Sequence, residues 1–223
     1  MASVQLVRQR NVQTRTTTKI DQVQSLQLVQ TMLHSALSTL TYLRNLFPDR
    51  AFEERRYELR DTVIPYTDYA AARIPLVNDD TDVPHTNLPI LVRDRSRRAD
   101  AFLDWLVSES GASQWHGTNT LQEKGAFPEL ESGDLRAVQI LIHPDKQRRN
   151  EVLETYTFIV RYIFAESGQR TPSAVVTEVP EEQEATTSYA HTALHELLRN
   201  VDRLCEDLPQ LPCECFLLAR AAQ

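Results

Sequence analysis

The chain has little glycine, with 5 residues in 223, and it contains neither GxGxxG nor GxxxxGK[ST]. Loops that cradle nucleotide phosphates use glycine because the backbone must approach the phosphate closely. It also lacks an apolar run of the roughly 18 residues that a membrane-spanning helix needs, and its N-terminus shows no signal sequence. The sequence therefore predicts an intracellular, soluble protein without membrane partners, and it disfavours a nucleotide-dependent enzyme.

Cysteine and positive charge are also scarce. The three cysteines, Cys205, Cys213 and Cys215, lie near the C-terminus, and an odd number in an intracellular chain favours free thiols over disulfides. Lys plus Arg number 24 against 31 Asp plus Glu, which gives a net charge of −7. That charge disfavours direct binding to nucleic acid. The basic cluster RDRSRR, residues 93 to 98, is more typical of a solvated loop and first helical turn than of a phosphate site.

Two motifs suggest metal binding, and both are incomplete. His191 and His195 have the i, i+4 spacing of two ligands on a helix, but their order is not HExxH and no third ligand is evident. Asp79, Asp80 and Asp82 lack the glycine and the terminal glutamate of a calcium loop. We therefore expect no metal, no cofactor and no enzymatic activity. A hydrolase of unrecognised type is the alternative.

Three segments have helical periodicity. The first runs from Asp21 towards Phe47 and is predicted to end before Pro48. The second follows Ser96 as a cap and covers residues 97 to 106; the third begins at residue 187 or 188, and its apolar stripe ends at Leu204 and Cys205. Because each has one apolar face, all three are predicted to pack on a common core. The first stripe consists of Leu26, Val29, Leu33, Ala36, Leu37, Leu40, Leu43 and Phe47.

Other segments alternate as strands do. Residues 135 to 142 and 153 to 164 are rich in β-branched and aromatic residues and are joined by a polar connector, which predicts an antiparallel hairpin. CECFLLARA, residues 213 to 221, predicts a last strand. Irregular segments are predicted at 1 to 19, a flexible tail, at 65 to 92, with one short strand at LPILV, and at 107 to 122 and 166 to 187.

The connector begins with His143-Pro144-Asp145, the tripeptide with which J-domain co-chaperones stimulate a chaperone ATPase. A J-domain places this tripeptide between two helices, the first of them basic. Here both flanks alternate as strands, and the upstream one has a single basic residue, Arg136. A J-domain co-chaperone is thus the alternative from another class. Stimulation of a chaperone ATPase that His143→Gln abolishes would support it.

Several blocks in order resemble the HORMA domain, and most closely the fungal HORMA proteins of the meiotic chromosome axis. They are TYLRNLFP at the end of the first helix, ADAFLDWL, ETYTFIVRY on the long strand, and TALHELLRNVDRL. The resemblance covers about residues 20 to 220. It implies an α+β fold with three helices packed on one face of an antiparallel β-sheet with a hairpin. It also implies that residues 20 to 223 form one domain, incomplete at its C-terminus and truncated before the safety belt.

In that family the safety belt wraps over a short closure-motif peptide, and an AAA+ ATPase reopens the complex. The resemblance therefore implies a non-enzymatic adaptor of the nuclear meiotic chromosome axis and synaptonemal complex. It would bind closure-motif peptides of axis proteins or of itself by strand addition, associate with chromatin indirectly, and support homologue pairing and homologous recombination. A HORMA adaptor of the spindle checkpoint or of DNA repair is the alternative within the fold.

The peptide-binding edge is predicted at the last strand, residues 211 to 220, beside the helix 188 to 205. Exposed N–H and C=O groups of an edge strand supply affinity there, and alternate side chains supply selectivity. The residues expected to form this site are Leu211, Cys213, Cys215, Phe216, Leu217, Leu218, Arg220, Leu194 and Leu198.

The segment 107 to 122 interrupts the family pattern, since its removal joins FLDWL to EKGAF. Val107-Ser108 can be encoded by a splice-donor sequence and Leu121-Gln122 can end in an acceptor, so a retained intron is one interpretation. A genuine surface loop is the other. Sequencing the transcript across these codons separates the two.

Overall fold

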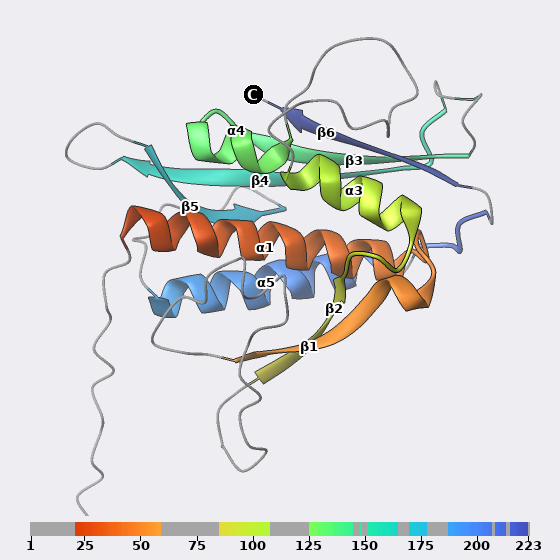
Figure 1. Cartoon of the computed structure of the whole chain (residues 1–223), viewed down its shortest axis with the longest axis horizontal. Helices are drawn as coiled ribbons and strands as arrows, with labels where there is room; N and C mark the ends of the chain where they lie inside the picture. The colour runs from red at the N-terminus through yellow and green to blue at the C-terminus, as the bar shows by residue number, and fades with distance from the viewer. Residues whose placement is uncertain are drawn as a thin grey trace, which may run out of the picture.

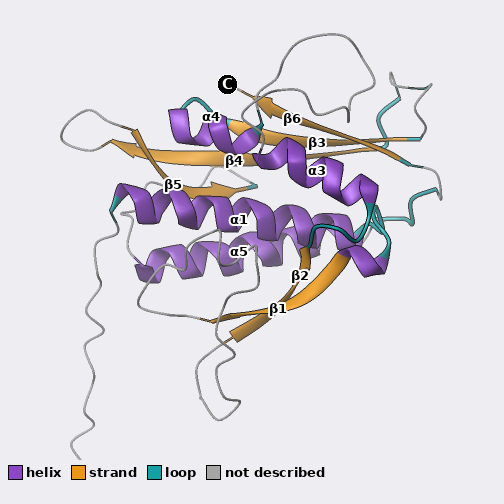
Figure 2. Cartoon of the chain, viewed as in Figure 1, coloured by secondary structure: helices purple, strands orange, loops and turns teal. Residues whose placement is uncertain are grey.

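The structure is a computed structural model that describes residues 21–58, 85–107, 125–144, 148, 151–164, 170–177, 187–206, 208–212 and 215–222. Figures 1 and 2 show the elements in place. In chain order they are α1 (Gln22–Leu43), the 3-10 turn η1 (Asp49–Ala51), β1 (Phe52–Glu58), β2 (His85–Leu91), α3 (Arg97–Val107), α4 (Ala126–Ser132), β3 (Ala137–His143), β4 (Glu154–Phe164), β5 (Arg170–Val176), α5 (Thr187–Glu206) and β6 (Phe216–Ala222).

A four-stranded antiparallel sheet has the order β5-β4-β3-β6, and β1 and β2 pair separately as a hairpin. One face of the four-stranded sheet is buried: Val138 and Ile140 of β3 and Tyr156 and Phe158 of β4 join residues of all four α-helices in one core. The intervening residues of β3 and β4 are more exposed, as a half-covered sheet requires. The predicted α+β fold is confirmed, with a fourth short helix, α4.

α1 is the central element, and its two ends have clear causes. Asp21 and Gln24 form a capping box, in which the Gln24 N–H donates to Asp21 Oδ1 at 2.8 Å and the Asp21 N–H donates to Gln24 Oε1 at 3.1 Å. The helix ends at Leu43, four residues before the predicted end at Phe47. Asn45 adopts a left-handed φ of 52°, which stops the helix. Phe47 is still buried, but in the turn that follows.

The second face of α1 is buried as well, although it is polar. His34 and Ser38 bind the backbone of β2: His34 Nε2 lies 3.1 Å from the Leu91 carbonyl oxygen, and the Leu91 N–H donates to Ser38 Oγ at 3.1 Å. Figure 1 shows α1 between the four-stranded sheet and the β1–β2 hairpin. The polar face therefore serves as a docking surface for the hairpin.

His34 predicts an acid-dependent loss of stability. Burial, together with the nearby positive charges of Arg93 and Arg55, lowers its pKa to about 4. Because the unfolded chain takes up this proton near pH 6.5, the contribution is complete above about pH 6.5 and is lost as the pH falls towards 4. We expect about 1.4 kcal/mol less stability at about pH 5.5 than at neutral pH from this group. Urea unfolding at several pH values, of the wild type and of His34→Gln, which keeps a donor for Leu91, measures this loss. If the free energy of unfolding fell equally with pH in both proteins, His34 would not be its source.

Two segments predicted to be irregular contain regular strands, so these predictions are wrong in part. The segment 166–187 was expected to be irregular, but it contains β5, in which residues 172 to 175 are buried. Pro172 obscured this strand; it pairs opposite Tyr162 next to a register shift in the ladder, and an edge strand tolerates proline there. The segment 65–92 contains β2 from His85, so the strand is longer than LPILV.

The hairpin β3–β4 is confirmed, and with it the argument against a J-domain. His143 is the last residue of β3 and is buried, with its Nδ1 2.9 Å from the Glu151 carbonyl oxygen. The tripeptide thus begins at the last residue of a strand, and its Asp145 lies outside the described residues. The predicted tail 1–19 and residues 108–122 of the predicted insertion also lie outside them.

Candidate functional site

The described strands leave one part of the sheet without a partner. β4 is longer than β5, and the ladder between them ends at the pair Ile159–Val176. The first five residues of β4, Glu154 to Phe158, pair with β3 on one side. In the described part of the chain no strand pairs with them on the other side. We call this stretch the open edge.

The backbone of the open edge offers hydrogen bonds to an incoming strand. The Val160 N–H donates to the Arg136 carbonyl oxygen at 2.8 Å, so even-numbered residues of β4 direct their backbone groups towards β3. Alternation then directs the N–H and C=O groups of Thr155 and Thr157 away from β3. Two residues of the open edge can therefore form ladder hydrogen bonds with an added strand.

A groove of about 470 Å³ follows the open edge. Its far wall comes from the C-terminal part of α5 and from Leu208, just beyond that helix. Leu153, Leu204 and Leu208 are 45%, 48% and 38% exposed, which is high for leucine. The groove thus combines unpaired backbone with an apolar rim. Its lining residues are Leu153, Glu154, Thr155, Tyr156, Thr157, Phe158, Thr177, Val201, Leu204 and Leu208.

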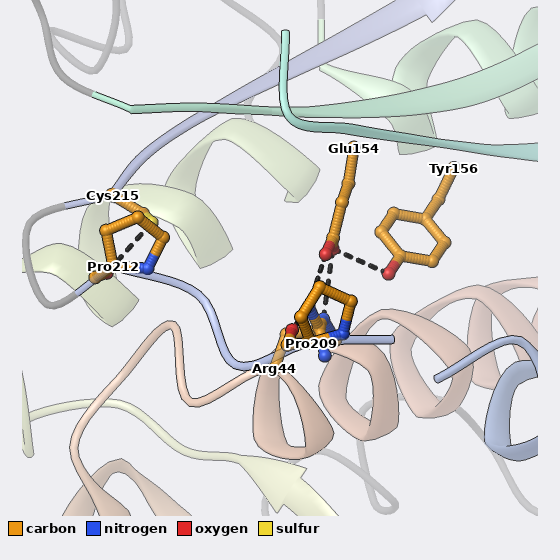
Figure 3. A network of polar contacts seen from close by, with 6 residues as sticks. All are labelled: Arg44, Glu154, Tyr156, Pro209, Pro212 and Cys215. Atoms are coloured by element: carbon orange, nitrogen blue, oxygen red, sulfur yellow. Dashed lines mark hydrogen bonds and ion pairs between the residues drawn. The ribbon is translucent and has the colours of Figure 1, made fainter. Parts of the chain in front are cut away.

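A buried polar network includes Glu154 and Tyr156, two residues that line the groove (Figure 3). Arg44, which caps α1, donates from Nε to Glu154 Oε2 at 3.0 Å, and its Nη2 contacts Glu154 Oε1. The Tyr156 hydroxyl donates to Glu154 Oε2 at 2.8 Å. The same Arg44 Nη2 donates to the Pro209 carbonyl oxygen at 2.8 Å. The network joins α1, β4 and the segment after α5.

The titratable groups beside this ion pair stay neutral. Burial, followed by the hydrogen bond to Glu154, raises the pKa of Tyr156 well above its usual range. Burial also raises the pKa of the Cys205 thiol, although its hydrogen bond with Tyr156 opposes the shift. Two neutral side chains, Tyr156 and Cys205, therefore adjoin the Arg44–Glu154 ion pair.

The structure places the predicted site residues in two separate regions. Phe216, Leu217, Leu218 and Arg220 lie on β6, an edge strand as expected, and Cys215 lies just before it. β6 is at the opposite edge of the sheet from β5, the strand that α5 packs against. The expected position of the last strand beside the helix 188–205 is therefore wrong.

The remaining predicted site residues lie in different surroundings. Leu194 and Leu198 are 1% and 8% exposed and belong to the core. Leu211 precedes β6 and packs partly against the core, and Cys213 lies outside the described residues. The open edge was missed because β5 was not predicted, so the unequal strand lengths could not be seen.

The metal and membrane expectations were compared with the described residues. Among them, no group of three His, Cys, Asp or Glu side chains is placed to hold a metal ion. His195 is half-buried on α5, and the side chain of His191 is not described. Within the same ranges, no helix combines the length and apolar character needed to cross a membrane.

Comparison with known proteins gives consistent results. Residues 25–220 match the HORMA domain family. The meiosis-specific protein HOP1 of Saccharomyces cerevisiae is 26% identical over 228 residues, which cover 99% of this chain and 32% of HOP1. The chain therefore spans about a third of the length of this curated relative.

Two solved structures have a similar fold. C. elegans HTP-1 bound to the HIM-3 closure motif aligns with a TM-score of 0.52 at 16% identity, covering 91% of this chain and 71% of HTP-1. C. elegans HTP-2 bound to the HIM-3 closure motif aligns with a TM-score of 0.54 at 13% identity, covering 91% and 70%. The family match extends over nearly the whole chain, and the α+β architecture agrees with it. The chain belongs to the HORMA domain family.

Proposed function

We propose that this chain is a non-enzymatic adaptor of the meiotic chromosome axis that captures an extended peptide at the open edge of β4. The observation that carries the proposal is the unpaired stretch Glu154 to Phe158 beside an apolar groove. Similarity to HOP1, a meiosis-specific protein, supports the meiotic setting over the spindle checkpoint or DNA repair. HTP-1 and HTP-2, which bind closure motifs, support peptide capture.

The geometry indicates what the peptide must offer. An added strand would form hydrogen bonds with Thr155 and Thr157, and its side chains would alternate between the two faces of the sheet. Those directed towards α5 would meet Leu204 and Leu208 and should be apolar. Those on the other face would lie beside the two threonine side chains, which are exposed and half-exposed. We therefore expect apolar residues at alternate positions of the peptide.

The wider role follows from the same relatives and is part of the proposal. The peptide would be a closure motif, from another axis protein or from a longer form of this protein. Such capture would assemble the axis in the nucleus, associate it with chromatin indirectly, and support homologue pairing and recombination. An AAA+ ATPase would release the peptide. The outer edge of β6 is the second place where a strand could add, because in the described part of the chain β6 pairs only with β3.

A peptide array tests the proposal. Overlapping 15-residue peptides that cover HOP1 outside the matched third would be probed with the purified chain, and positive peptides would be measured by fluorescence polarisation. At least one peptide with alternating apolar residues is expected to bind. Binding of none, or binding that protects only β6 from hydrogen exchange, would contradict capture at the open edge.

Two substitutions should weaken binding without unfolding the protein. Thr157→Pro removes an N–H from the open edge and none from the ladder with β3, so affinity for a positive peptide should fall by about 10-fold or more. Leu204→Gln removes apolar rim and should lower affinity by about 5- to 30-fold. Polarisation titrations give both values, and far-UV circular dichroism checks folding.

Matched controls exist for both variants. Thr157→Val keeps the backbone N–H and the branched shape, so it should bind within about 3-fold of the wild type. Val23→Gln changes another exposed apolar residue, 63% exposed at the start of α1, far from the groove along the chain. If the controls lose as much affinity as Thr157→Pro and Leu204→Gln, the peptide binds elsewhere.

A further inference from the structure

The chain between α5 and β6 connects the helix that packs against β5 to the strand at the opposite edge of the sheet. We call its described residues, 208–212 and 215, the crossover. Two arginines donate to its backbone. Arg44 binds the Pro209 carbonyl oxygen at 2.8 Å, and Arg98 of α3 binds the Cys215 carbonyl oxygen at 3.2 Å. Within the crossover, the Cys215 thiol donates to the Pro212 carbonyl oxygen at 3.0 Å (Figure 3).

The two arginines differ in their surroundings. The side chain of Arg44 is 5% exposed and is held by the Glu154 carboxylate, whereas the Arg98 contact is exposed. A charged donor fixed in a dry site makes a stronger hydrogen bond than one that competes with water. Arg44 is therefore the main anchor of the crossover.

Arg44 also connects the crossover to the groove. Its partner Glu154 lines the groove from β4, and Leu208, next to Pro209, lines it from the other wall. We infer that Arg44 is a positioning residue that couples occupation of the groove to the anchoring of the crossover and β6. The coupling rests on the proposed peptide capture, whereas the anchoring does not.

The coupling works in both directions, as linkage requires. With Arg44 in place, the wall of the groove at Leu208 is already ordered. A binding peptide then pays a smaller entropy cost for ordering that wall, so its affinity is higher. Conversely, a peptide packed on Leu208 and on the open edge keeps the neighbouring Pro209 beside Arg44. Bound peptide should thus protect β6, although no residue of β6 lines the groove.

Hydrogen exchange with a double variant tests the anchor. Arg44→Leu/Glu154→Leu replaces the ion pair with apolar side chains, an exchange that buried pairs often tolerate, and removes the donor to Pro209. Amides of residues 208–212 and 215–222 should then exchange about 10- to 100-fold faster in the peptide-free protein, while those in the middle of α1 stay near wild-type rates. Arg98→Ala should change the same amides by less than about 3-fold, because its contact is exposed.

A second variant covers the case in which the double variant does not fold. Arg44→Lys keeps a positive charge for Glu154, but lysine is shorter and lacks the forked guanidinium that reaches both Glu154 and Pro209. Hydrogen exchange in the crossover and β6 should therefore still become faster. Wild-type exchange there in either folded variant overturns the anchor. The array-positive peptide separates the remaining outcomes: a lower affinity of about 10-fold in these variants supports the coupling, and unchanged affinity overturns it. If the variants show faster hydrogen exchange but no peptide binds the wild type, the anchoring role of Arg44 stands. The coupling and the proposed peptide capture are then both overturned.

Discussion

Replacing Phe102 by alanine should lower the free energy of unfolding by about 3–5 kcal/mol. Phe102 is 0% exposed, and its ring lies between Phe47 and Trp105, with centroid distances of 5.8 Å to each. Removing the ring costs its transfer free energy and leaves a cavity beside Phe47 and Trp105. Urea unfolding followed by circular dichroism measures the loss.

Tyr42→Ala is the matched control for this prediction. Tyr42 also makes an aromatic contact, edge-on to Phe52 at 5.2 Å, but it is 44% exposed. Its removal should cost only about 0.5–1.5 kcal/mol. A loss on Phe102→Ala no greater than that on Tyr42→Ala would mean that Phe102 does not belong to the close-packed core.

Elements with a strong local pattern could be predicted from the sequence. The stripe of α3 and the alternation of β4 each bury one face, so their residues carry the signal directly. The polar face of α1 carries no such signal. His34 and Ser38 look like solvent-facing residues, because nothing local indicates that Leu91, more than fifty positions away, supplies their partner. Short α4, with glycines at both caps, has too few residues for a periodicity.

The candidate site was harder to predict because it depends on which strands are neighbours. The resemblance to the HORMA domain implied that the last strand is an edge strand, but its distance from α5 depends on the order β5-β4-β3-β6. Leu204 was assigned to the buried stripe of its helix. It is 48% exposed because β5 stops before it could cover that part of β4. Unequal strand lengths leave both the backbone of β4 and this leucine available.

The partner of Arg44 was even harder to predict from the sequence. A single arginine after an amphipathic helix reads as a solvated residue near the helix C-terminus, where positive charge is favourable. Its partner Glu154 begins a strand that is more than a hundred residues away and is half-buried. Only the tertiary fold brings the residue that caps α1 and the first residue of β4 together in a dry site.

Arg44→Met should therefore be among the most destabilising single substitutions, with a loss of about 3–5 kcal/mol. Methionine fills much of the volume, but Glu154 would stay buried without its ion-pair partner. It would keep the donor from the Tyr156 hydroxyl, and the Pro209 carbonyl would lose its bond from Arg44. Urea unfolding at neutral pH gives the value. The double variant Arg44→Leu/Glu154→Leu should recover most of that loss, because it removes the buried charge together with its partner. If the single and double variants were equally unstable, the cost would come from lost packing around the guanidinium and not from an uncompensated carboxylate.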